Sequence, residues 1–430
     1  MARPWARAAR WLAFLGPFFF LSYGAATWIT TQHASVGAVV FDWERNIPFI
    51  PWTIIPYWSI DVLYGLSLFL CAARRELDTH ARRLLTAQII AVSCFLLFPL
   101  TFTFPRPAVE GVAGFLFDAL GKFDKPFNQA PSLHIALLVI LWDRYARHAP
   151  YWARGGLHAW FALIGVSVLT TYQHHFVDVP TGALLGFFCL WLWPEQGPSP
   201  LRTMRITTDP ARVRLAVRYA AGAALCAALA AWMGGGTLWL LWPAVSLVLV
   251  AAHYALFGAA GFQKAADGRM SLAARALLAP YIMGAWINSR LWTRNDPLTV
   301  LIAPPVSLGR FPSRATASAF VTIIDLCAEL PGASGAVAYR ALPMLDLITP
   351  PPEQLRQAVA LIETACDSGP VLVCCALGYG RSAACVTAWL LATGRAADME
   401  AAMRVVRAAR PRAVLKDGAR AAIAAAAISR

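Results

Sequence analysis

The sequence predicts a polytopic α-helical membrane domain with about eight transmembrane helices, followed by a compact α/β domain. Apolar stretches of roughly 20 residues, the length that crosses a bilayer, recur through the first 260 residues. Arginines gather in alternate segments between these stretches. After about residue 300, short buried strands alternate with amphipathic helices, a pattern typical of an α/β domain.

The composition favours the membrane class for the N-terminal part. Of the 430 residues, 58% are hydrophobic and only 14% are charged, which is unusual for a soluble globular protein. A formal net charge of +14 is compatible with nucleic-acid binding. The arginines, however, are distributed between apolar blocks and form no single basic face. We therefore expect no nucleic-acid partner.

Eight apolar segments are long enough to be candidate spans. They occupy residues 12–31, 52–71, 84–104, 129–147, 156–173, 176–194, 214–233 and 237–259. Asp143 and Arg144 interrupt the fourth, which is the weakest. The first apolar run lacks a small-residue cleavage site, so we expect a retained span rather than a signal peptide.

The distribution of positive charge predicts the orientation. Lys and Arg are enriched in cytoplasmic segments, and placing the N-terminus inside leaves only four on the outer side, namely Arg45, Arg106, Lys122 and Lys125. Eight spans then return the chain to the cytoplasm, where cysteines stay reduced. The expected location is an integral, multi-pass position in the lipid bilayer of a bacterial inner or plasma membrane, with the C-terminal domain cytoplasmic.

Three polar motifs fall on the predicted outer face: FPRP at 104–107, APSLH at 130–134 and TYQHHFVDVPTG at 171–182. The i, i+4 spacing of His174 and Asp178 lets the carboxylate orient the imidazole. A second histidine, His134, and the cations Arg106, Lys122 and Lys125 complete the set. Such residues suit phosphoryl transfer, in which one histidine attacks phosphorus, another protonates the leaving oxygen and cations hold the phosphate oxygens.

These motifs resemble the three signatures of the type 2 phosphatidic acid phosphatase superfamily, especially its inositol phosphorylceramide synthase-like branch. The resemblance covers roughly residues 10–195. It implies a six-helix phosphatase core acting on membrane lipid phosphates, with His174 as nucleophile, Asp178 as its orienting partner and His134 as general acid.

Two phosphate-binding cations of that family are absent from this chain. Pro99 stands where the family has Lys, and Val168 stands where it has Arg. We expect Arg106 to bind phosphate, as the motif implies, and Lys122 and Lys125 to substitute for the missing cations.

The C-terminal region contains a phosphate-binding pattern of another kind. Residues 321–326 and 371–375 are predicted strands, and 354–366, 382–393 and 398–409 are predicted helices. After the second strand, Gly378 and Gly380 let backbone N–H groups converge, and Arg381 and Ser382 open a helix whose N-terminus attracts anions. Arg381 can hold two phosphate oxygens, and the same field favours the thiolate of Cys375, a nucleophile.

Asp346 lies between a predicted strand and a Pro-rich helix start, where it could donate a proton to a leaving oxygen. Residues 300–425 resemble the dual-specificity branch of the protein tyrosine phosphatases. The resemblance implies Cys375 as nucleophile, Arg381 as transition-state clamp, Ser382 as helper in cleaving the thiophosphate and Asp346 as general acid. Cys374 stands where the family usually has His.

The sequence therefore predicts a bifunctional membrane phosphatase with one phosphate site on each side of the bilayer, needing no metal or cofactor. One alternative is a membrane-anchored signalling phosphatase acting on phosphoproteins. Another is an inner domain that binds phosphate without turnover. The expected organisation is a phosphatidic acid phosphatase-like domain, two further spans, a linker with a possible interfacial amphipathic helix, and a dual-specificity phosphatase-like domain, at residues 1–195, 196–260, 261–299 and 300–430.

Overall fold

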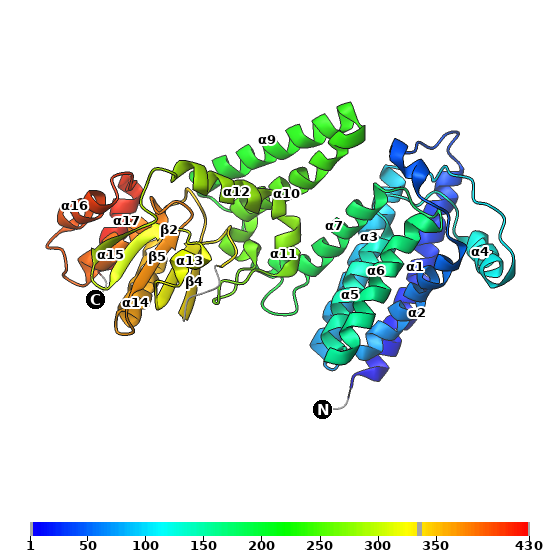
Figure 1. The fold of residues 1–430 in the computed structure, drawn as a ribbon, viewed down its shortest axis with the longest axis horizontal. Coiled ribbons are helices and arrows are strands. Elements are labelled where there is room, and N and C mark those ends of the chain that lie inside the picture. Colours follow the sequence, from blue (N-terminus) through cyan, green and yellow to red (C-terminus); the bar gives the residue numbers. More distant parts are fainter. Residues whose placement is uncertain (1–2, 333–337, 429–430) are drawn as a thin grey trace. The chain divides into compact units, whose positions relative to one another are not determined.

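The computed structural model describes residues 3–332 and 338–428. The chain folds into two compact units (Figure 1). Unit 1 comprises Met1–Arg202 with Met233–Leu238, and unit 2 comprises Thr203–Trp232 with Trp239–Arg430. The two helices predicted as the last spans therefore fall mainly in the same unit as the α/β domain.

Unit 1 is a helical bundle. Its main helices are α1 (Trp5–Thr31), α2 (Ile54–Leu70), α3 (Arg74–Leu97), α5 (Leu133–His148), α6 (Arg154–Thr170) and α7 (Asp178–Leu192). Helix α5 is central and packs against α2, α3, α6 and α7. A shorter helix, α4 (Gly111–Phe123), stands to one side of the bundle (Figure 1), and α8 (Pro200–Thr203) ends it.

The close approach of α5 and α7 depends on two glycines of α7. A Cβ atom at Gly182 would lie 2.5 Å from the main-chain oxygen of Ser132, and one at Gly186 would lie 2.8 Å from that of Ala136. Small residues four apart let two helices pack backbone to backbone. This packing sets the start of α5 beside the start of α7, where two of the predicted outer motifs lie.

The predicted third span, 84–104, was placed too late in the chain. Helix α3 begins at Arg74 and ends at Leu97, so its first turns include arginines that precede the predicted span. The Glu76 side chain accepts hydrogen bonds from the Ala72 and Ala73 N–H groups and so caps the start of the helix. Hydropathy alone misses this start because the capping turn is charged.

The charges that interrupt the fourth predicted span are paired in the structure. Arg144, fully buried on α5, contacts the carboxylates of Glu76 and Glu195. Arg83 on α3 lies 3.3 Å from both Asp143 and Glu195. Burying a guanidinium group is costly unless it is paired, so these acidic partners explain how α5 continues through Asp143 and Arg144.

Among the described residues, five helices are long and apolar enough to cross a membrane: Trp5–Thr31, Pro51–Leu70, Arg74–Leu97, Pro210–Met233 and Gly235–Phe262. The fourth, fifth and sixth predicted spans correspond to α5, α6 and α7, which have 16, 17 and 15 residues. These helices are shorter than the roughly 20 residues that cross a bilayer, so they are not among the five.

Unit 2 contains a five-stranded mixed sheet with the strand order β1-β2-β5-β3-β4. The strands are β1 (Thr299–Ala303), β2 (Val306–Arg310), β3 (Thr322–Cys327), β4 (Ala338–Met344) and β5 (Val371–Cys375). Only β1 pairs antiparallel, and β5 lies between β2 and β3. The central strand β5 is buried along its whole length, which agrees with its unbroken apolar sequence.

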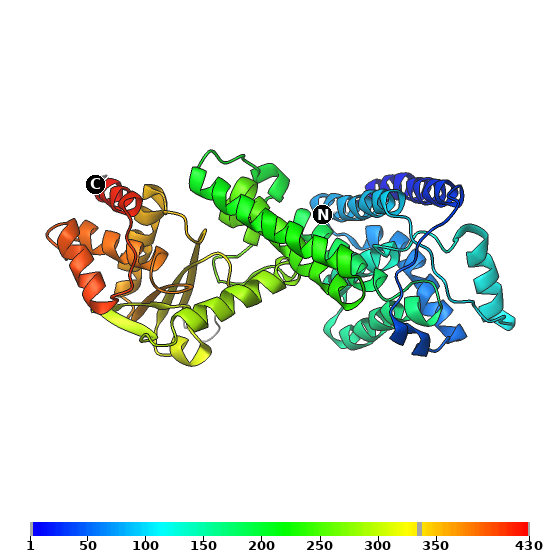
Figure 2. The same cartoon turned by 90° about the horizontal axis from the view of Figure 1, so that it is seen from above.

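Four helices, α14 (Pro352–Cys366), α15 (Arg381–Ala392), α16 (Met399–Ala409) and α17 (Asp417–Ile428), enclose the main core with one face of the sheet. Figure 2 shows these helices beside the sheet from above. The strands at 321–326 and 371–375 and the helices at 354–366, 382–393 and 398–409 are thus confirmed to within a few residues. On the other face, the short helix α13 (Arg314–Ala317) covers Ile323, Leu372 and Cys374.

The part of unit 2 that precedes the sheet is mostly helical. It comprises α9 (Pro210–Met233), the short η4 (Gly235–Leu240), α10 (Leu241–Ala252), the π-helical turn η5 (His253–Phe257), η6 (Gly258–Phe262), α11 (Leu272–Leu277) and α12 (Ala279–Trp292). Helix α12 packs on the α/β domain through Ile282 and Ala285, which contact Phe311 and Ala376. The segment expected to be a linker is therefore folded against the sheet.

Candidate functional site

The Cys-x5-Arg loop connects the end of β5 to the start of α15. Cys375 is the last residue of the strand and Arg381 the first of the helix. The Cys375 sulfur lies 3.1 Å from the Ser382 hydroxyl and accepts the Gly378 N–H over 3.3 Å. The structure therefore brings the predicted nucleophile, helper hydroxyl and loop together at a helix N-terminus, where anions are favoured.

The two loop glycines have different structural requirements. Gly378 has a φ of +76°, and a Cβ there would lie 2.8 Å from the Gly309 carbonyl carbon, so the loop needs glycine at this position. A Cβ at Gly380 would meet open space. Only Gly378 is thus required by the backbone path.

Arg381 is held by two carboxylates although it is only 3% exposed. Its two terminal nitrogens donate to Glu329 over 2.8 and 2.6 Å, and one of them lies 2.9 Å from Asp346 Oδ1. It also donates to the main-chain oxygen of Met344. Its Nε atom is buried and has no partner among the described residues. One guanidinium donor therefore remains for a bound anion.

The two carboxylates beside Arg381 differ in their ionisation. Burial alone would raise the pKa of Glu329, but the charge and hydrogen bonds of Arg381 outweigh it, so this pKa lies below its usual value. For Asp346, burial raises the pKa and the charge of Arg381 compensates only in part. Environments that separate two carboxyl pKa values assign different roles to them. Glu329 is suited to remain ionised, and Asp346 is suited to carry a proton.

Asp346 lies two residues after the end of β4 and before α14, in the position between a strand and a helix that the sequence predicted. Its side chain is 35% exposed. Its main-chain oxygen accepts a hydrogen bond from the Tyr254 hydroxyl, 3.0 Å away. A residue of the π-helical turn after α10 therefore fixes the loop that carries the predicted acid.

Cys374 lies away from this site. Successive residues of a strand point to opposite faces, and Cys374 packs with Ala317, Ile323 and Leu372 whereas Cys375 belongs to the main core. Burial raises the pKa of the Cys374 thiol. The residue that replaces the usual histidine is therefore an apolar packing group beneath the loop.

In unit 1, the structure joins two of the outer motifs by hydrogen bonds. His174 Nδ1 lies 3.2 Å from Asp178 Oδ2, and His174 Nε2 lies 3.0 Å from the Ser132 hydroxyl. Both His174 and Asp178 are buried. The carboxylate fixes the ring through Nδ1, which leaves Nε2 as the atom able to attack phosphorus.

His134 stands on the first turn of α5. Its ring stacks on Tyr57 with centroids 4.2 Å apart, and its Nε2 is buried without a partner among the described residues. The ring is thus held by stacking, and one nitrogen remains available for proton transfer.

The three predicted cations are placed differently. Arg106 donates to the Tyr172 oxygen over 3.5 Å, next to the loop that holds His174, and its guanidinium lies over the Phe117 ring. Lys125 donates to the Gly121 oxygen at the end of α4. Among the described contacts, none joins Lys122 or Lys125 to the histidines. The geometry therefore favours Arg106 over the lysines as the cation of this site.

The neighbouring His175 makes hydrogen bonds that hold loops of the protein together. Its Nδ1 lies 2.9 Å from the buried Glu44, and its Nε2 accepts the Thr103 N–H over 3.2 Å. Glu44 also accepts the Phe176 N–H. These bonds tie three loops of unit 1 together, so His175 holds the loop in which His174 lies.

Four residues of these sites were not predicted: Glu329, Tyr254, Ser132 and Asp124. Asp124 accepts a hydrogen bond from the Tyr23 hydroxyl over 2.7 Å. Ser132 lies inside the motif quoted for His134 and could have been chosen from it. Glu329 and Tyr254 are 52 and 127 residues from Arg381 in sequence, and no local pattern marks them.

A loop between a strand and a helix, with Cys375 at one end and Arg381 at the other, is the site of a cysteine-dependent phosphatase. The chain is a phosphoric ester hydrolase. Residues 315–426 match the model of the dual specificity phosphatase catalytic domain. The C-terminal region is thus a domain of this type.

Similar solved structures cover less than a third of this chain. They include Tk-PTP in the active form, with 24% identity, 31% of this chain, 99% of that chain and a TM-score of 0.28. A mouse putative dual specificity phosphatase complexed with zinc tungstate has 27% identity over 30% of this chain and 86% of its own, with a TM-score of 0.27. Human DUSP28 has 25% identity over 30% and 92%, with a TM-score of 0.26. No curated protein sequence matches the chain.

Proposed function

We propose that the C-terminal domain hydrolyses phosphate monoesters through a phosphocysteine intermediate. The Cys375 thiolate attacks phosphorus, the bond from phosphorus to the ester oxygen breaks, and Asp346 donates its proton to that oxygen. Water then cleaves the sulfur–phosphorus bond with the help of Ser382, and phosphate leaves. The observation that carries this proposal is the buried Arg381, whose Nε has no partner among the described residues. Arg381 directly precedes Ser382, whose hydroxyl contacts the Cys375 sulfur.

Hydrolysis of an aryl phosphate by the purified full-length protein tests the proposal. The unmodified protein should hydrolyse it and be inhibited by vanadate, and Cys375→Ser should be inactive. Rapid acid quenching should trap phosphate on Cys375. A folded protein that binds vanadate but shows no turnover would favour the alternative, in which the domain only binds phosphate.

We further propose that unit 1 is membrane-embedded and carries a second, histidine-dependent site for lipid phosphates on the outer face. The hydrogen-bonded series Ser132, His174 and Asp178 supports this function, because it orients the His174 ring and leaves Nε2 beside a hydroxyl donor. His134 would protonate the leaving oxygen and Arg106 would bind the phosphate. Water or a lipid alcohol would then accept the phosphoryl group, which makes the site a phosphatase or a phosphotransferase.

Product analysis after incubation with a radiolabelled lipid phosphate distinguishes these two reactions. Free phosphate indicates hydrolysis, and a labelled second lipid indicates transfer. In a Cys375→Ser background, which removes the C-terminal activity, His174→Ala should abolish both products with an unchanged melting temperature. Lipid turnover that persists when both His174 and Cys375 are replaced would contradict the proposed histidine site.

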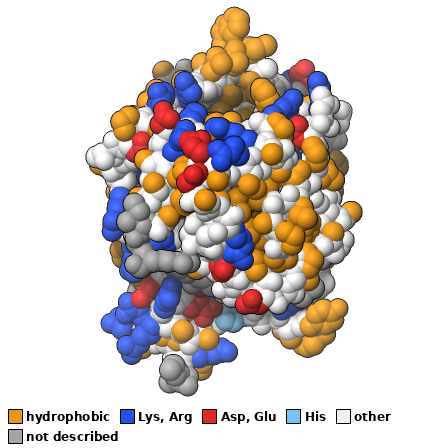
Figure 3. All heavy atoms as spheres, turned by 90° about the vertical axis from the view of Figure 1, so that its left-hand side faces the viewer, with side chains coloured by type: hydrophobic (Ala, Val, Ile, Leu, Met, Phe, Trp, Pro, Cys, Tyr) orange, Lys and Arg blue, Asp and Glu red, His pale blue; other side chains and the backbone are white. Residues whose placement is uncertain are grey.

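Phosphoproteins are the alternative substrates for the C-terminal domain. The face of the molecule in Figure 3 carries positive and negative side chains interspersed with apolar ones. The C-terminal domain also has the exposed ion pairs Arg395–Glu363 and Arg420–Glu400. Such a mixed surface is typical of a domain in water. We propose a cytoplasmic location for it, which a reporter fused to the C-terminus can test.

A further inference from the structure

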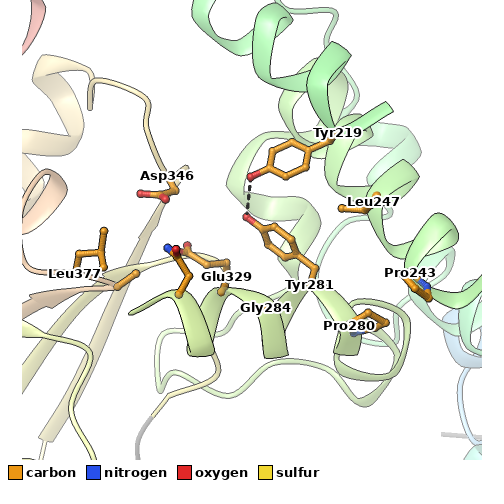
Figure 4. Close-up of a pocket in the computed structure, with 12 residues that line it drawn as sticks. Tyr219, Pro243, Leu247, Pro280, Tyr281, Gly284, Glu329, Asp346 and Leu377 are labelled. Carbon is orange, nitrogen blue, oxygen red and sulfur yellow. Dashed lines mark hydrogen bonds between the residues drawn. The ribbon is translucent and has the colours of Figure 1, made fainter. Parts of the chain in front are cut away.

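One cavity connects the candidate phosphatase site to two of the helices that are long and apolar enough to span a membrane. It has a volume of about 360 Å³, and all its lining residues belong to unit 2. At one end lie Glu329, Asp346 and the loop residue Leu377 (Figure 4). At the other end lie side chains of α9, α10 and α12, namely Tyr219, Pro243, Leu247, Pro280 and Tyr281.

The wall opposite the phosphatase loop is largely apolar. Pro243 and Leu247 come from the segment Gly235–Phe262, and Tyr219 comes from Pro210–Met233, both of which meet the length and hydropathy needed for a span. The Tyr219 and Tyr281 hydroxyls lie 3.5 Å apart in the cavity (Figure 4). At one end the cavity reaches the loop that follows Cys375, through Ala376 and Leu377, and its other end is apolar. This arrangement matches a ligand with a phosphate headgroup in the loop and a hydrocarbon body in the cavity.

Helix α12 adds a second observation. Its inner face contacts the α/β domain, whereas Met283, Trp286 and Leu291 on its outer face are 61%, 50% and 59% exposed. Arg290 lies over the Trp286 ring. Exposed apolar and aromatic residues flanked by arginine are typical of a helix at a bilayer surface. Helix α12 also packs against α10, which belongs to a candidate span.

We propose that the substrate of the C-terminal site is a membrane lipid that ends in a phosphate monoester, and that it enters the site along α9, α10 and α12 directly from the bilayer. This inference rests on the proposed phosphatase function. The lipid phosphate lies in the Cys375 loop, and its apolar part lies against Leu247 and Pro243. Hydrolysis breaks the bond between phosphorus and the lipid oxygen, which takes the proton of Asp346, and releases phosphate and a lipid alcohol.

A bulky residue in the cavity tests the route. A Cβ at Gly284 has nothing within 4 Å, so Gly284→Phe can be accommodated and its ring would fill the space next to the site. Met283→Phe is the matched control, because it adds a ring on the same helix at an exposed position outside the cavity. Both changes are made in full-length His174→Ala protein, so that the proposed outer site contributes no lipid turnover.

Four probes are compared in detergent micelles: long-chain phosphatidic acid, glycerol 3-phosphate, a phosphotyrosine peptide and an aryl phosphate. We expect phosphatidic acid to be hydrolysed with a kcat/KM at least about tenfold above that of glycerol 3-phosphate, which lacks the chains. Gly284→Phe should lower the ratio of lipid to aryl phosphate turnover by about tenfold or more, and Met283→Phe should leave that ratio unchanged.

The outcomes separate the two proposals. Aryl phosphate turnover with no preference for the lipid, or with a preference for the phosphopeptide, would overturn the lipid inference and leave the phosphatase intact. An equal lipid-to-aryl ratio in both phenylalanine variants would also overturn it. Absence of all turnover, with Cys375 intact and the protein folded, would instead overturn the phosphatase function itself.

Discussion

The Tyr254 hydroxyl donates a hydrogen bond to the main-chain oxygen of Asp346 over 3.0 Å. Tyr254 follows α10, a candidate span, and Asp346 is the proposed general acid of the α/β domain. The bond thus connects the position of the apolar helices to the loop on which proton donation depends. It also makes the helical part of unit 2 a component of the catalytic domain.

Tyr254→Phe should reduce turnover of substrates that need an acid. One neutral hydrogen bond contributes about 0.5–1.5 kcal/mol, so kcat for an alkyl phosphate should fall by roughly 2- to 10-fold. The same change made in Asp346→Asn should have no further effect, because the acid is already lost. An equal further reduction in that background would show that Tyr254 acts other than through Asp346.

Asp346→Asn should change the pH dependence of the reaction. The acid must be protonated, so turnover falls as the pH rises through the Asp346 pKa, which burial raises above the usual aspartate value. The asparagine variant should lose this basic limb, and its kcat for an alkyl phosphate should fall about 100-fold. An aryl phosphate, whose leaving group needs less protonation, should be affected less. A basic limb retained in the variant would assign it to another group.

Glu329→Gln should destabilise the C-terminal domain. Removing one partner of a buried ion pair costs about 3–5 kcal/mol, although Asp346 still faces Arg381 and reduces the loss. The Glu329 pKa is lowered in the folded state, so its contribution is present above the unfolded pKa and is lost as the pH falls through the folded value. Chemical unfolding at neutral and acid pH measures the difference.

Glu353→Gln is the matched control for that change. Glu353 pairs with Arg356 at the surface, where ion pairs contribute little. We expect its unfolding midpoint to equal that of the unmodified protein at both pH values. A similar loss in both variants would remove any special role of the Glu329–Arg381 pair.

His174→Ala and Cys375→Ser should silence different activities. The proposed reactions use different nucleophiles in two different compact units, so His174→Ala should retain vanadate-sensitive aryl phosphate hydrolysis. Cys375→Ser should retain the histidine-dependent lipid product. Loss of both activities in either folded variant would rule out independent sites.

Cys374→Ala should retain aryl phosphate turnover within about twofold, because this thiol packs with Ile323 and Leu372 on the face away from the loop. Deleting a buried sulfur leaves a small cavity, so a modest decrease in stability of about 1 kcal/mol is expected. Peroxide should inactivate this variant and the unmodified protein at the same rate. Slower inactivation of the variant would indicate that Cys374 takes part in oxidation of Cys375.

Several features followed from the sequence because they depend on local chemistry. The apolar run at 371–375, the glycine at 378 and the helix that begins at Arg381 lie close together in the sequence, so the strand, the loop and the helix were predicted together with the candidate residues that they carry. The five helices that are long and apolar enough to cross a membrane were likewise visible as hydropathy. Periodicity and backbone requirements act over a few residues, so they can be recognised in the sequence without knowledge of the tertiary structure.

The tertiary structure decided which distant residues complete each site. Glu329 meets Arg381 because parallel pairing sets β3 beside β5, and Ser132 meets His174 because two glycines let α7 approach α5 closely. Only the structure shows that Arg106, rather than Lys122 or Lys125, lies next to the histidine loop. Charge and spacing in a sequence do not specify such contacts, because they depend on how whole strands and helices pack. For this reason the sequence determined the candidate nucleophiles and their loops, whereas the fold alone determined their partners and the cavity between the phosphatase site and the apolar helices.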